Sequence, residues 1–96
     1  MKIRWLRKAL ENIEQEATYI SRENPVAANK VVQHIYNSVA LLAENPTLGH
    51  PGRIPDTREL TVPDTRYIVP YRVRPRLKQI EILRVFHTSR KLPQSW

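Results

Sequence analysis

The placement of proline divides this 96-residue chain into two halves that must fold differently. Seven of its eight prolines lie beyond residue 45, and the eighth, Pro25, directly follows an asparagine. Proline interrupts the interior of a helix but suits its first turn, so residues 1–44 can form long helices whereas the rest of the chain cannot. The sequence therefore predicts helices first, followed by strands joined by turns.

Two apolar stripes with helical spacing occupy the first half. A short segment over residues 2–6 alternates charged and apolar side chains and predicts an opening strand. Asn24-Pro25 is a favourable pair for starting a second helix, which is expected to end at Asn45-Pro46. The stripes consist of Leu6, Leu10, Ile13, Ala17 and Ile20, and of Ala28, Val32, Ile35, Val39 and Leu42. They predict two amphipathic helices that pack as a hairpin.

Three strand-like segments follow in the second half, at residues 58–62, 67–73 and 79–86. The polar turn over residues 74–78 predicts that the last two pair as an antiparallel hairpin. Pro70 cannot donate a hydrogen bond, so its strand is expected to be bulged, locally unpaired or at an edge. We predict one α+β domain over residues 1–96, in the order β-α-α-β-β-β, with the N-terminal helical hairpin packed on a small antiparallel sheet.

Positive charge is concentrated in the second half. Residues 1–44 hold six Lys or Arg against five acids, a net charge of +1, whereas residues 45–96 hold ten against four, a net charge of +6. Such a surface attracts a polyanion or an acidic protein, and charge alone does not choose between them. Eight of the ten basic residues are arginines, which suit bidentate recognition of phosphate or carboxylate. Any single arginine on a half-exposed sheet is more often an ordinary solvated residue.

Several kinds of site and location are disfavoured by the composition. The chain has no cysteine, and its three histidines lack the spacing of metal ligands, so neither a disulfide nor a metal site is expected. No glycine-rich phosphate loop or nucleophile elbow occurs, and no cofactor is expected. The N-terminus lacks the apolar core of a secretory signal, and no stretch could span a membrane. These features predict a protein of the cytoplasm.

The end of the last predicted strand carries the most concentrated set of functional candidates. An imidazole and a basic pair, His87, Arg90 and Lys91, cluster where the strand stops. Side chains at a strand end are positioned by a rigid scaffold yet remain accessible to a partner. Trp96, the last residue, is either docked on the fold or offered to a partner.

The order of elements and three motifs together resemble the RelE/ParE toxin superfamily over nearly the whole chain. The motifs are Arg58-Glu59-Leu60, the segment Tyr67-Ile68-Val69-Pro70-Tyr71-Arg72-Val73, and the segment from Ile80 to Arg90. The resemblance implies the toxin of a type II toxin–antitoxin pair, as used in plasmid stabilisation. Its partner is then an antitoxin, ParD-like or related, whose acidic C-terminal segment wraps around the toxin in a hetero-oligomer.

The two branches of this superfamily imply different activities. RelE-like members are ribosome-dependent mRNA endonucleases. If this chain were one of them, His87 would be the acid or base, and Arg72, Arg84 and Arg90 would stabilise the charge on the scissile phosphate. Pro63 stands where the RelE-type arginine is expected, and Leu92-Pro93 replaces a late tyrosine. The ParE-like branch, whose members poison DNA gyrase by binding it, matches better through Arg58-Glu59-Leu60 and His87-x-x-Arg90. A basic nucleic-acid-binding module without a toxic target is a further alternative.

These considerations give a set of expected site residues. Target binding is expected from Arg58, Arg72, Arg84, His87, Arg90, Lys91 and Trp96, with no catalytic residue in the ParE-like reading. Antitoxin binding is expected from the exposed rims of the helical stripes, at Leu10, Ile13, Val32 and Val39.

Overall fold

The helical hairpin forms as the apolar stripes predict. A computed structural model describes all residues 1–96, with α1 spanning Arg7–Ser21 and α2 spanning Pro25–Ala40. The side-chain oxygen of Asn24 accepts a hydrogen bond from the N–H of Ala27 at 3.0 Å, and Pro25 occupies the first helical position. α2 ends at Ala40, earlier than expected, because the chain tightens into a 3₁₀ turn, η1 (Leu41–Ala43).

The buried face of α1 differs from the predicted stripe by part of a turn. Ala9, Ile13 and Glu16 are buried, whereas Leu10 is 43% exposed. The stripe of apolar residues includes Leu10 and leaves out Glu16, so periodicity alone places Leu10 on the core face. An acidic side chain can occupy this buried position because hydrogen-bond partners from the sheet half surround its carboxylate.

Six strands form a single sheet, one face of which packs against the helices. They are β1 (Lys2–Trp5), β2 (His50–Pro51), β3 (Arg58–Thr61), β4 (Tyr67–Arg74), β5 (Gln79–Ile82) and β6 (Phe86–His87), and a 3₁₀ turn, η2 (Pro75–Leu77), joins β4 to β5. The strand order is β1-β5-β4-β3-β2, and β6 pairs with β4 beyond the end of β5. The α+β class, the element order and the antiparallel β4–β5 hairpin are confirmed.

One strand pair departs from the predicted antiparallel sheet. β1 pairs in parallel with β5, so the sheet is mixed. The two strands are joined through both helices and the rest of the sheet, so no tight turn imposes an antiparallel orientation on them. Parallel pairing then buries Ile3 and Trp5 against the same core as the helices.

The ladder between β4 and its β5–β6 neighbour is interrupted beside Pro70, so the strand of Pro70 is locally unpaired, which is one of the predicted alternatives, and the extra residue lies in the facing segment. Ile68 pairs with Phe86 and Tyr71 with Ile82, so two residues of β4 face the three residues 83–85. The carbonyl of Pro70 accepts from the N–H of Leu83 at 2.9 Å, and Pro70 has no N–H to return. The bulge breaks the predicted 79–86 strand into β5 and β6 and redirects the chain toward α1.

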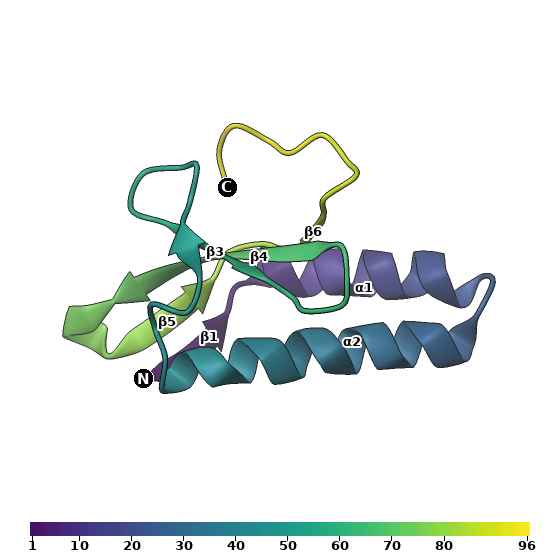
Figure 1. The fold of residues 1–96 in the computed structure, drawn as a ribbon, viewed down its shortest axis with the longest axis horizontal. Coiled ribbons are helices and arrows are strands. Elements are labelled where there is room, and N and C mark those ends of the chain that lie inside the picture. The colour runs from purple at the N-terminus through teal and green to yellow at the C-terminus, as the bar shows by residue number, and fades with distance from the viewer.

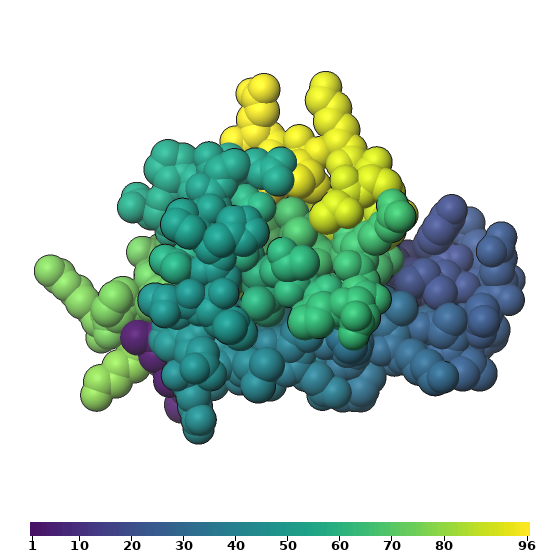
Figure 2. Space-filling view, in the orientation of Figure 1, coloured from purple at the N-terminus to yellow at the C-terminus, as the bar shows by residue number.

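The two faces of the sheet have different coverings. In Figure 1 both helices lie beneath the sheet, while the connector before β3 and the C-terminal segment lie above it. The core between sheet and helices includes Ile35, Val39, Val69, Tyr71, Ile80 and Ile82. The space-filling view in Figure 2 shows the C-terminal segment at the surface opposite the helical hairpin. Neither helix is long and apolar enough to cross a membrane.

Candidate functional site

A cluster of four side chains joins α1 to the two strands at one end of the sheet. We call Glu16, Tyr67, His87 and Arg90 the strand-end site. Because β6 pairs with the start of β4, His87 lies directly opposite Tyr67, and their rings meet edge to face with centroids 5.1 Å apart. The site is therefore built from α1, β4 and the segment that follows β6.

Glu16 is the anchor of the strand-end site. One carboxylate oxygen accepts from the hydroxyl of Tyr67 at 2.9 Å, and the other accepts from the guanidinium of Arg90. Glu16 is 7% exposed, whereas about half of the Arg90 side chain remains in contact with solvent. The guanidinium also lies over the ring of Tyr19, 5.6 Å from its centroid. Arg90 is thus held in place while the outer edge of its guanidinium stays accessible to a partner.

The electrostatics of the strand-end site favour one arrangement of protons. Burial raises the pKa of the Tyr67 hydroxyl above its ordinary value, and the hydrogen bond to Glu16 raises it further. The hydrogen bond to Glu16 also raises the pKa of the Arg90 guanidinium. Tyr67 therefore stays a neutral donor and Arg90 stays charged, so Glu16 accepts from both at once.

His87 is oriented by its own chain rather than by the other members of the site. Its Nδ1 accepts from the backbone N–H of Ser89 at 3.2 Å and lies 2.6 Å from the hydroxyl oxygen of Ser89. A neutral imidazole that accepts at Nδ1 carries its proton on Nε2. Nε2 is therefore the ring nitrogen that takes no part in this turn.

A second group of predicted residues stacks beside the strand-end site. Arg84 donates from Nε to the side-chain oxygen of Asn12 at 2.8 Å, and its guanidinium lies 4.6 Å from the ring centroid of Phe86. Trp96 packs on the same ring, with centroids 5.5 Å apart. The alternative in which Trp96 docks on the fold is thus the one observed. Asn12 also accepts from the N–H of Val85 and so fixes the chain after the bulge.

The remaining predicted target-binding residues lie apart from these groups. Arg58 donates to the carbonyls of Gly49 and Thr47, at 2.8 and 3.3 Å, and so holds the connector before β3. Arg72 lies 4.0 Å from Glu81 on β5. Lys91 is exposed beside the strand-end site and makes no ion pair. The structure therefore groups His87, Arg90 and Lys91, and separates them from Arg58 and Arg72.

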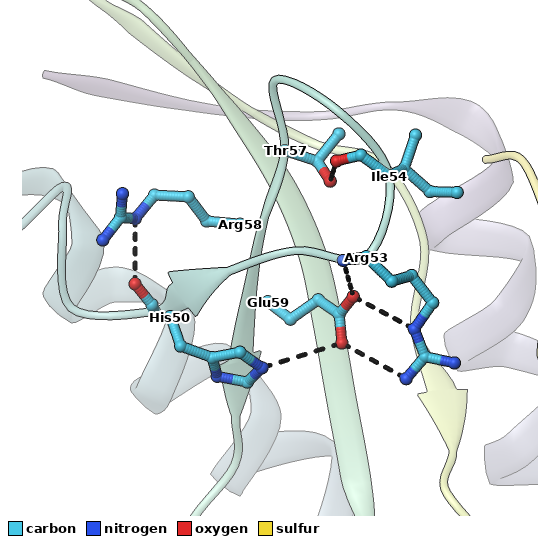
Figure 3. Close-up of polar contacts among 7 residues, drawn as sticks. His50, Arg53, Ile54, Thr57, Arg58 and Glu59 are labelled. Atoms are coloured by element: carbon cyan, nitrogen blue, oxygen red, sulfur yellow. Dashed lines mark hydrogen bonds and ion pairs between the residues drawn. The ribbon is translucent and has the colours of Figure 1, made fainter.

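Arg58-Glu59 has a structural role that its sequence did not reveal. Figure 3 shows the Glu59 carboxylate enclosed by the connector, facing His50 and Arg53. Its oxygens accept from the backbone N–H of Arg53 at 2.9 Å and from its guanidinium Nε at 3.3 Å, and His50 Nε2 is 3.8 Å away. The residue is 3% exposed. The motif therefore fixes the connector on the sheet.

Sequence reasoning missed Glu16 and Tyr67 as members of the strand-end site, and Asn12 as the partner of Arg84. The available signal was an acid and an amide on the helical face that buries Ala9 and Ile13. Polar residues on a buried face require partners, but the sequence does not show which strand supplies them. Tyr67 belongs to the motif over residues 67–73, but only the structure shows that its hydroxyl is satisfied by Glu16.

The predicted antitoxin-binding residues differ in accessibility. Ile13 and Val39 are buried in the core between the helices and the sheet, and Val32 packs against that core. Leu10 is exposed. Antitoxin binding at this surface stays a prediction, and the accessible part of it is centred on Leu10.

The geometry also bears on the alternative catalytic set. Each guanidinium has a different partner: Arg72 faces Glu81, Arg84 holds Asn12, and Arg90 holds Glu16. No hydrogen bond or ion pair joins any of them to the imidazole of His87. No group of three His, Asp or Glu side chains could hold a metal ion.

Comparisons with known proteins agree on one family. The model of the "ParE toxin of type II toxin-antitoxin system, parDE" matches residues 3–92. A Sinorhizobium fredii protein designated a toxin, Y4kP, is 43% identical over 93 residues, which cover 97% of this chain and 94% of that protein. A solved structure of the chromosomal ParDE toxin–antitoxin system of P. aeruginosa superposes with a TM-score of 0.79 at 32% identity, covering 91% of this chain and 95% of that one.

Proposed function

This chain belongs to the ParE toxin family of type II toxin–antitoxin systems, and on that premise we propose that it arrests growth by binding DNA gyrase. In this proposal the toxin acts in the cytoplasm, stalls gyrase on cleaved DNA and so blocks replication. A cognate ParD-like antitoxin with an acidic C-terminal segment neutralises it. The chain itself breaks no bond.

One observation carries the choice of binding over catalysis. Arg90 is fixed by Glu16 and lies over Tyr19, yet about half of its side chain faces solvent next to His87 and Lys91. A preorganised, partly exposed arginine is typical of a docking contact, because little conformational entropy remains to be lost on binding. By contrast, the residues that an endonuclease would need are each engaged by separate partners.

The test compares the two targets directly. Purified protein is incubated with gyrase and supercoiled DNA, and in parallel with ribosomes programmed with message. We expect double-strand cleaved DNA to accumulate in the first reaction and intact message in the second. Cleaved message with unaffected gyrase would instead establish the RelE-like endonuclease alternative.

A variant of Arg90 tests the role of the strand-end site. Arg90→Ala, or removal of Pro93–Trp96, is expected to abolish growth arrest on induction while leaving antitoxin binding within a few-fold of wild type. Lys30→Ala, an exposed lysine on α2, is the control and should retain full arrest. If both variants still arrest growth as strongly as wild type, the strand-end site does not bind the target.

The antitoxin proposal has its own measurement. The adjacent reading frame should encode a short protein with an acidic tail, and complex formation should increase amide protection within residues 7–44, around Leu10. If hydrogen exchange in this segment is the same in the free and bound toxin, the antitoxin docks elsewhere.

A further inference from the structure

A second basic surface lies at the other end of the sheet, far from the strand-end site. β4 starts at Tyr67, beside His87, and ends at Arg74, and seven residue steps along a strand span about 23 Å. The β4–β5 hairpin projects at the left of Figure 1, away from the C-terminal segment. Of the residues expected to bind the target, Arg58 and Arg72 lie toward this end of the sheet, apart from the strand-end site.

Sheet register gathers the charges of this surface. Lys2 and Arg74 both pair with Gln79, and Arg4 and Arg72 both pair with Glu81. Directly paired residues point to the same face, here the face opposite the helices, since the alternate residues Ile80 and Ile82 belong to the core. With strands about 4.8 Å apart, the Cα atoms of these four residues lie at the corners of an area of about 10 by 7 Å.

We define Lys2, Arg4, Arg72, Arg74 and Arg76 as the cationic sheet face. One acid, Glu81, lies within it, and Arg72 and Arg74 share a single oxygen of that carboxylate at 4.0 and 3.1 Å. Lys2, Arg4 and Arg76 are exposed and have no ion-pair partner. Five positive charges against one negative charge leave a net charge of +4 on a small area.

The cationic sheet face borders a groove between the connector and the end of β4. The groove is lined by Arg58, Arg72, Arg74 and Arg76, with Asp56 as its acid. Val73, Leu77 and three prolines supply its apolar lining, whereas four guanidinium groups face a single carboxylate. The excess of positive charge therefore suits a ligand with repeated negative charge.

No aromatic side chain belongs to the cationic sheet face, and this further limits the class of ligand that it can bind. Tyr67 and Tyr71 point to the opposite face and are buried, and Trp5 packs against Tyr36. Unstacked bases thus find no platform here, whereas a duplex presents one phosphate charge per about 1.7 Å of its axis. We infer that the cationic sheet face is a binding site for the phosphate backbone of duplex DNA, read without base specificity.

This inference concerns contact with DNA itself, so it stands or falls separately from gyrase as the target. Direct contact with the duplex would strengthen the binding of a toxin that holds a topoisomerase on cleaved DNA. Binding to naked DNA, however, needs no topoisomerase. The gyrase assay above tests the function, and the following measurement uses no gyrase.

The experiment titrates purified toxin against a fluorescent 24-base-pair duplex at several salt concentrations. Each neutralised phosphate contributes a slope of about −0.9 in log affinity against log salt, so a net charge of +4 gives a slope of roughly −3 to −4. Arg74→Gln/Arg76→Gln should reduce the steepness by about 2 and weaken binding at least tenfold at 0.1 M salt. Lys8→Gln/Lys30→Gln removes the same charge from exposed helical positions and should weaken binding less than threefold.

A variant that is expected to bind DNA more tightly distinguishes a loss of the binding site from a loss of affinity caused by misfolding. Glu81→Gln removes the only acid of the cationic sheet face and frees two arginines, so it should tighten duplex binding several-fold and steepen the salt slope by about 1. Poly-glutamate and a single-stranded oligonucleotide of equal charge are competitors and should displace the duplex poorly. Equal weakening by the two double variants, no gain in Glu81→Gln, or preferential binding of poly-glutamate or of the single strand would overturn the inference.

Discussion

At the scale of single residues, Glu16 links the helical hairpin to the functional end of the sheet. Its carboxylate replaces an apolar side chain on the buried face of α1 and accepts from Tyr67 and Arg90. A buried carboxylate that lost these donors would carry the whole cost of its desolvation. The position of Arg90 therefore depends on a residue 74 positions earlier in the chain.

A double-mutant cycle can measure this link. Glu16→Ala should lower the free energy of unfolding by about 1–3 kcal/mol, because the Tyr67 hydroxyl is left buried without a partner. Tyr67→Phe should cost about 1 kcal/mol, and the double variant less than the sum, since neither group is then orphaned. Urea denaturation gives all three values. Strict additivity would show that the hydrogen bond does not stabilise the fold.

The raised pKa of Tyr67 predicts a dependence of stability on pH. The folded state keeps the phenolic proton above pH 10, where an unfolded tyrosine loses it. The stabilisation by Tyr67 is thus complete below about pH 10 and is lost as the pH rises above that value. Between pH 10 and 11.5 the unfolding free energy of wild type should fall more steeply than that of Tyr67→Phe, by up to about 1.4 kcal/mol per pH unit. Parallel curves for the two proteins would contradict this.

At the scale of elements, the connector before β3 is held by side chains rather than by regular structure. The Tyr71 hydroxyl donates to the carbonyl of Pro46 at 2.7 Å and accepts from the N–H of Gly49 at 2.9 Å. Arg58 and Glu59 secure the same segment from β3. This fixed connector forms one wall of the groove beside the cationic sheet face.

Gly49 is required here because of close approach rather than backbone conformation. A Cβ at this position would lie 2.6 Å from Cε1 of Tyr71 and 2.8 Å from the carbonyl oxygen of Glu59. Gly49→Ala should therefore displace the buried tyrosine and lower the free energy of unfolding by about 1–3 kcal/mol. Leu48→Ala, at the exposed neighbouring position, is the control and should cost less than about 0.5 kcal/mol in the same denaturation experiment.

At the scale of the whole molecule, β1 closes one side of the structure. It supplies the edge beyond β5, its Ile3 and Trp5 pack on the core, and the N-terminal amine donates to the carbonyl of Ala43 at 2.7 Å. The parallel pair therefore ties together the first strand, the end of the helical hairpin and the last hairpin of the sheet.

Removal of residues 1–5 should consequently destabilise the entire domain. We expect a loss of about 3 kcal/mol or more from the two apolar side chains alone, and a fall in melting temperature on the order of 15 °C. Removal of residues 93–96, which add no strand to the sheet, should change the melting temperature by only a few degrees. Similar losses for the two truncations would show that β1 is dispensable for the fold.

Local pattern by itself determined the two helices and the main strands, but not β2 or the division of residues 79–86 into β5 and β6. Helical periodicity, the Asn24-Pro25 start and the prolines of the second half act within a few residues, and the missing N–H of Pro70 predicts a local interruption of its ladder. The motifs also sufficed to indicate the toxin family. They placed His87 and Arg90 together because the two share one short segment.

Only the tertiary structure decided which distant residues meet. Three features join residues that lie far apart in the sequence. They are the parallel pairing of β1, the Glu16–Tyr67–Arg90 cluster, and the placement of Lys2 and Arg4 beside the arginines of β4. Such contacts depend on strand order and register, which periodicity does not encode. The same physics explains why Leu10 was misplaced, since a buried acid becomes acceptable only when a remote strand supplies its donors.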